Sequence, residues 1–213
     1  MKINVEIIKK ALIHHPLQIE KLNEKELVKK MMIRRRLSRN SKILVYLANE
    51  CEFKTGRVIY GSAYGELGDS VKILEAINAK EMVSPTTFQN SVYNTAPSYH
   101  SIVEGNTDEI TTISSGDNTS YTVMQEGALA LHKCDEVFVC TAEAMNFDGV
   151  DILNKCKNEL EYGVAFVIKK AVDEANIIVK SDSRIGVPKS IEWMQNLYDL
   201  CESNDRCIIE VEL

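Results

Sequence analysis

The sequence lacks the cysteine and histidine motifs that bind structural or catalytic zinc. Its six cysteines, at positions 51, 134, 140, 156, 201 and 207, include no C-x-x-C pair, and its four histidines form no H-E-x-x-H motif. These absences predict neither a metal centre nor a dithiol redox site. We therefore expect reduced thiols and a cytoplasmic location.

Long apolar runs and excess positive charge are also missing. No stretch approaches the ~18 uninterrupted apolar residues of a membrane-spanning helix. The first 17 residues carry Lys9 and Lys10 inside their apolar run, unlike a secretion signal. The net charge of -6 argues against nucleic-acid binding through the overall field of the protein.

The chain has the composition of an ordinary globular protein, and segments with a strand-like pattern alternate with segments of helical spacing. Its 213 residues, 45% of them hydrophobic, predict a single domain over residues 1–213. Apolar or alternating runs predict strands at residues 2–8, 57–60, 110–113, 137–140, 162–168, 177–179 and 207–211. Helical spacing predicts helices at residues 18–30, 41–51, 69–79, 87–103, 118–133 and 189–202. This alternation favours an α/β sandwich with a mostly parallel sheet.

The turn from Ser114 to Asp117 joins an expected strand to an expected helix, the place where many α/β enzymes hold a nucleophile. Its tip is Gly116, which has no side chain. Two interpretations stay open. The turn is structural, with Asp117 capping the helix, or Ser114 or Ser115 is a nucleophile, which requires a positioned base that the sequence does not indicate.

Five segments, taken in order, carry a resemblance to a known family. They are residues 34–39, 60–67, 83–94, 134–143 and 162–165. The third (VSPTTFQNSVYN) is similar to the stretch "isPxxFxxSVxN", and the fourth (CDEVFVCTAE) to the strand "aDvmlaGgaE". Over residues 30–180 the chain resembles β-ketoacyl synthases, and above all the short chain-length-factor partners of ketosynthases from aryl polyene-type pathways.

The resemblance implies the fold: one thiolase-like half, a three-layer α-β-α arrangement around a mixed five-stranded sheet. Residues 181–213 form a C-terminal extension outside it. Alignment from Glu143 places Gly116 at the position of the ketosynthase cysteine, or Asp117 if the register slips by one. The two catalytic histidine loops of ketosynthases lie in a second half that this chain is too short to contain. A non-catalytic protein without a cofactor or metal is implied.

The resemblance also implies a partner: a full-length ketosynthase that extends acyl chains on an acyl carrier protein. The implied heterodimer edge is the strand Ile110, Thr111, Thr112 and Ile113. The implied tunnel or interface residues are Thr87, Phe88, Val92 and Tyr93. A basic group, Arg34, Arg35, Arg36 and Arg39, is either a solvated surface or a docking patch for the partner subunit or the carrier protein.

Without its partner, the chain is expected to form homodimers or to aggregate. Two alternatives remain. One is a small acyl hydrolase or transferase that uses Ser114, Ser115 or Asp117, and the other is a standalone acyl-binding module.

Overall fold

A computed structural model describes residues 1–145, 160–180, 184 and 186–213. In this part of the chain six strands form one sheet in the order β3-β2-β4-β5-β1-β6. Their bounds are β1 Lys2–His15, β2 Arg57–Gly61, β3 Ile110–Ile113, β4 Glu136–Ala144, β5 Glu161–Lys170 and β6 Cys207–Glu212. The predicted mixed α/β class is confirmed, but the sheet has six strands rather than five.

The prediction of a mostly parallel sheet is wrong. Only the pairs of β2 with β3 and with β4 are parallel, whereas β4–β5, β5–β1 and β1–β6 are antiparallel. The difference arises at β1, which is longer than the expected 2–8 and inserts between β5 and β6. The expected strand at 177–179 is reduced to an isolated bridge between Ile177 and Ile209.

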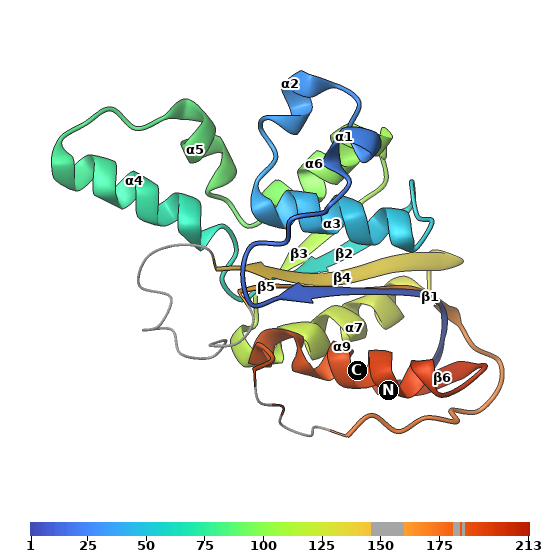
Figure 1. The fold of residues 1–213 in the computed structure, drawn as a ribbon. Helices are drawn as coiled ribbons and strands as arrows, with labels where there is room; N and C mark the ends of the chain where they lie inside the picture. The colour runs from blue at the N-terminus through green and yellow to red at the C-terminus, as the bar shows by residue number, and fades with distance from the viewer. Residues whose placement is uncertain (146–159, 181–183, 185) are drawn as a thin grey trace.

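Helices cover both faces of the sheet, as Figure 1 shows. On one face lie α3 (Arg39–Glu50) and α6 (Thr95–Glu104), and on the other lie α7 (Thr119–Ala130) and α9 (Lys189–Glu202). α7 approaches the sheet closely because it carries Gly127, where an added Cβ would lie 2.5 Å from Cγ1 of Val139. The expected three-layer α-β-α arrangement is therefore present.

Other helices depart from the predictions. The expected helix at 18–30 is reduced to α1 (Glu24–Leu27), followed by the short α2 (Met31–Arg34). The expected helix at 87–103 is split into α5 (Pro85–Asn90) and α6. The break lies before Pro97, so that Pro97 falls in the first turn of α6. At this position the missing N–H of proline costs no helical hydrogen bond.

α4 (Leu67–Ala79) and α5 extend away from the sheet (Figure 1). We call residues 67–93, which contain both helices, the α4–α5 arm. The pattern of Val71, Leu74 and Ile77 predicts an amphipathic helix, and the structure leaves α4 without a buried residue. A local pattern identifies an apolar face without identifying what covers it.

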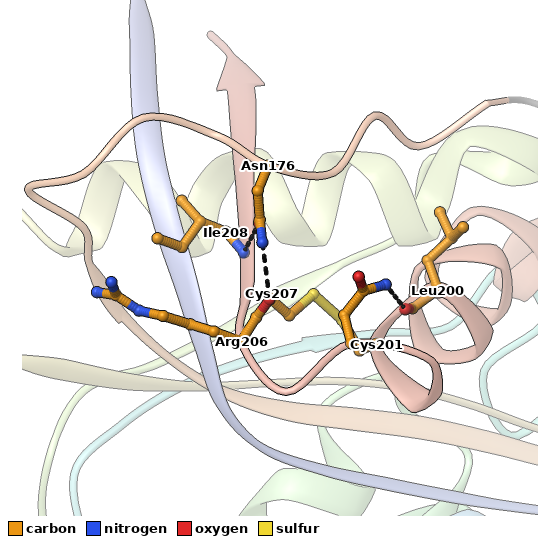
Figure 2. Close-up of a disulfide and its surroundings, with 7 residues drawn as sticks. Asn176, Leu200, Cys201, Arg206, Cys207 and Ile208 are labelled. Carbon is orange, nitrogen blue, oxygen red and sulfur yellow. Dashed lines mark hydrogen bonds between the residues drawn. A yellow bond between two sulfur atoms is a disulfide. The ribbon is translucent and has the colours of Figure 1, made fainter.

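The expectation of reduced cysteines is wrong for one pair. Cys201 near the end of α9 and Cys207 at the start of β6 form a disulfide, with Cα atoms 5.5 Å apart (Figure 2). Asn176 fixes the same corner: its amide donates to the Arg206 carbonyl at 2.9 Å, and its Oδ1 accepts from the Ile208 N–H at 2.8 Å. Position 156 lies outside the described residues.

No helix among the described residues is long and apolar enough to cross a membrane. Those residues also hold no group of three or more histidine, cysteine, aspartate or glutamate side chains that could bind a metal ion.

Candidate functional site

The turn at residues 114–117, which we call the elbow, lies between β3 and α7 and is exposed. Gly116 adopts a φ of 56°, in the left-handed region that glycine tolerates, and an added Cβ would meet nothing within 4 Å. The hydroxyl of Thr119 closes the turn, donating to the Gly116 carbonyl at 2.7 Å and accepting from the Ser115 N–H at 3.1 Å. The capping position of α7 is Asn118, so the expected capping role of Asp117 is wrong.

The elbow serines have no histidine base. Ser114 donates its hydroxyl to the Ala63 carbonyl at 3.4 Å. His100 is fully buried and stacks on the rings of Phe53 and Phe138. Burial lowers the pKa of His100 to about 4, so this side chain is neutral and belongs to the core. His14 and His15 lie on β1, away from the elbow in the sheet order, and His132 follows the C-terminal end of α7, the end remote from the elbow.

A buried carboxylate, Glu143, joins the elements around the elbow. It lies near the end of β4 and is fully buried. Its oxygens accept hydrogen bonds from Ser62 Oγ at 2.7 Å, from the Ala63 N–H at 2.6 Å and from Ser190 Oγ at 2.8 Å. Burial raises the pKa of Glu143 to about 6, against the opposing effect of these donors.

Glu143 is linked to the elbow through one residue, Ala63, whose N–H donates to the carboxylate. The Ala63 carbonyl accepts from the hydroxyl of Ser114 and also, at 3.2 Å, from the hydroxyl of Tyr93. The loop that Glu143 fixes therefore touches both the elbow and the α4–α5 arm. In the sequence, Glu143 serves only as the reference position from which Gly116 is aligned. A lone acidic residue near the end of the apolar run VFVCTA was the available signal.

β3 lies at one edge of the sheet, with β2 on its inner side. The N–H of Val58 donates to the Glu109 carbonyl and that of Ser62 to the Ile113 carbonyl. In a parallel pair, backbone groups alternate between the two sides, so those of Ile110 and Thr112 face outward. β3 thus presents an open hydrogen-bonding edge.

The α4–α5 arm carries exposed apolar side chains. Phe88 is 68% exposed, and Val92 and Tyr93 are also exposed, whereas Thr87 is half-buried. Leu74, Ile77 and Met82 add to the same arm, Met82 being 96% exposed. Gathered apolar side chains of this kind are typical of a protein–protein contact surface.

The expected basic patch is divided by the structure. Arg39 forms two hydrogen bonds of 2.6 Å with the fully buried Glu161, and it also donates to the Ile19 carbonyl. Arg34 donates to the Val28 carbonyl at 2.9 Å. These contacts give Arg34 and Arg39 a structural role, and the docking of a partner by the basic group stays a prediction. Arg35 and Arg36 are exposed.

A thiolase-like α/β layer structure with a glycine at the elbow defines the class: a ketosynthase-like domain. A family model for the N-terminal domain of β-ketoacyl synthases matches residues 14–198, and the chain belongs to this family. The match extends beyond the 30–180 of the sequence resemblance and includes most of α9. No curated protein matches the chain.

Solved structures share the fold. A ketosynthase in complex with its chain length factor from Xenorhabdus doucetiae matches with a TM-score of 0.71 and 17% identity, over 91% of each chain. The ishigamide ketosynthase/chain length factor matches with a TM-score of 0.61 and 10% identity, over 79% of this chain and 62% of that one. A β-ketoacyl synthase from Burkholderia phymatum matches with a TM-score of 0.60 and 13% identity, over 80% of this chain and 60% of that one. The chain thus spans less than two thirds of the latter two.

Proposed function

We propose that this chain is a non-catalytic chain-length factor, which pairs with a full-length ketosynthase in aryl polyene-type chain elongation on an acyl carrier protein. The observation that carries the proposal is Gly116 at the elbow, where the resemblance places the nucleophilic cysteine, directly after the open edge strand β3. The neighbouring structures described above as ketosynthase and chain length factor support this choice of partner.

Pairing uses two features of the described chain. The outward backbone groups of Ile110 and Thr112 bond to an edge strand of the ketosynthase, so that the two sheets become continuous. The α4–α5 arm then covers the ketosynthase surface, with Phe88 and Tyr93 closing one wall of its acyl tunnel. Fully burying an aromatic or aliphatic side chain contributes about 1.5–3 kcal/mol. Burial of several exposed residues of the arm would therefore contribute substantially to the free energy of binding.

The chain acts as one domain over residues 1–213, in the cytoplasm, and needs no cofactor. Without the ketosynthase, two copies pair through the same edge, because an open apolar strand edge favours self-association. The Cys201–Cys207 disulfide is unusual for that compartment.

Co-expression tests the proposal. The affinity-tagged chain, produced together with candidate full-length ketosynthases, is expected to retain one of them in a 1:1 complex. Intact-mass measurement after incubation with acyl-loaded carrier protein is expected to show the acyl group on the ketosynthase alone. An acyl adduct on Ser114, Ser115 or Asp117 would instead establish the chain as an acyl hydrolase or transferase.

A further inference from the structure

The α4–α5 arm buries little of itself against the body of the protein. α4 has no buried residue, and α5 has one, Asn90, whose Nδ2 donates to the Arg36 carbonyl at 3.0 Å. The arm leaves the sheet after β2 and returns before α6, and its two ends meet where Tyr93 contacts Ala63 (Figure 1). The position of the arm relative to the sheet is therefore set by the contacts at its base.

Tyr93, at the returning end of the arm, holds the departing end in two ways. Its hydroxyl donates to the Ala63 carbonyl at 3.2 Å. Its ring lies against Gly65, where an added Cβ would be 2.9 Å from the ring atoms Cδ1 and Cε1. Gly65 is buried and has a φ of 56°, so glycine suits both the backbone conformation and the close approach of the ring.

The loop that Tyr93 holds is fixed to the core and also contacts the elbow. Ser62 Oγ and the Ala63 N–H donate to the fully buried Glu143, at 2.7 and 2.6 Å. The Ala63 carbonyl accepts from the hydroxyl of Ser114, the first residue after β3. Tyr93 therefore connects the arm to the end of the edge strand through a single residue.

We infer that Tyr93 is a positioning residue, which fixes the α4–α5 arm relative to β3 so that the chain offers the ketosynthase one preformed surface. The inference rests on the proposed pairing function. A preformed surface pairs more tightly because the arm need not be ordered during association. Tyr93 is 44% exposed, so the part of its ring that does not cover Gly65 remains available to the partner.

Amide hydrogen exchange of the free chain tests the role of the hydroxyl without a partner. Tyr93→Phe removes the bond to Ala63 and leaves the ring. We expect exchange of residues 63–66 to become about fivefold faster, because one net hydrogen bond of about 1 kcal/mol corresponds to that factor. Tyr121→Phe is the matched control, expected to change this exchange by less than about twofold. The Tyr121 hydroxyl also donates to a backbone carbonyl at 3.2 Å, but to that of Glu212 on β6, at the opposite edge of the sheet from β3.

Gly65→Ala tests the ring contact from the other side. The added methyl group displaces the Tyr93 ring, and exchange of residues 63–66 is expected to become at least about tenfold faster. Tyr93→Ala is expected to have an effect of similar size. In the Tyr93→Ala background, Gly65→Ala adds only backbone strain, so its further effect is expected to be at least about threefold smaller than in the wild type.

Pairing with the ketosynthase tests whether the position of the arm matters. Gly65 is buried beneath Tyr93, so a loss of affinity in Gly65→Ala arises from the displaced arm rather than from a lost contact with the partner. We expect pairing at least about fivefold weaker, with slower association. Gly105→Ala, at a φ of 70° but with nothing within 4 Å of an added Cβ, is the control and is expected to pair within about twofold of the wild type.

Unchanged exchange in both Tyr93→Phe and Gly65→Ala would overturn the inference, as would fully additive effects of Gly65→Ala and Tyr93→Ala. Faster exchange with unchanged pairing would also overturn it, because the partner would then be indifferent to the position of the arm. Tyr93→Phe decides the outcome if Gly65→Ala does not fold. In all these cases the wild type still pairs, whereas a wild type that binds no ketosynthase would show that the proposed function itself is wrong.

Discussion

Substituting Thr112 by proline tests the edge-strand role of β3 because it removes one outward-facing backbone N–H. The N–H of Thr112 faces away from β2, so proline removes an outward donor without removing a β2–β3 bond. A paired ketosynthase strand would lose that bond and leave a buried carbonyl unsatisfied, at a cost of about 1–3 kcal/mol. This corresponds to pairing that is about 5- to 150-fold weaker.

The assay is biolayer interferometry of the tagged chain against its ketosynthase, with thermal unfolding of the chain alone measured in parallel. Thr112→Val retains the N–H and is the matched control, expected to pair within about twofold of the wild type. Unchanged affinity of Thr112→Pro, with an unchanged unfolding temperature, would refute β3 as the pairing edge. Equal losses of affinity in both variants would show that the side chain, not the backbone, makes the contact.

Three further predictions concern the chain alone. Glu143→Gln is expected to destabilise the fold by about 1–3 kcal/mol in urea titrations, because an amide has one acceptor oxygen and cannot accept all the bonds that Ser62, Ala63 and Ser190 donate to the carboxylate. The exposed Glu126→Gln is the control, and its stability is expected to lie within about 0.5 kcal/mol of the wild type. The buried neutral His100 binds a proton more readily once unfolded. The contribution of His100, measured as the difference in stability between the wild type and His100→Leu, is therefore expected to shift against the wild type by up to about 3 kcal/mol as the pH drops from 6.5 to 4. The difference is the quantity to measure because the raised pKa of Glu143 acts in the opposite direction in both proteins, and a difference independent of pH would contradict the prediction. Cys201→Ser is expected to cost about 2 kcal/mol, since the disulfide closes a short loop with a sequence separation of 6; an intact mass unchanged by reductant in the wild type would show that the bond is absent.

Local elements were predictable because their patterns are complete within a few residues. The apolar run at β4, the alternation at β6 and the helical spacing of α9 all predicted elements that the structure contains. The N-cap of α3 is Ser38, a residue type that favours this position, and its hydroxyl accepts from the Ser41 N–H. The glycine tip of the elbow was also readable from the sequence.

Features that depend on distant residues were not predictable. The bond from Arg39 to Glu161 spans 122 positions, and that from Ser62 to Glu143 spans 81. No local pattern distinguishes these buried partners from solvated charges. The exposure of Leu74 on α4 is not predictable for a related reason, since periodicity shows that a helix has an apolar face but not whether this chain or a partner covers it.

Backbone amide hydrogen exchange, measured on the chain alone and in complex with its ketosynthase, tests the central claim most directly. The account predicts that complex formation slows exchange in residues 110–113 and in the α4–α5 arm, residues 67–93, while β6 at the opposite edge of the sheet is unchanged. Protection of β6 or of the outer surface of α7 and α9, with β3 and the arm still exchanging as in the free chain, would contradict it.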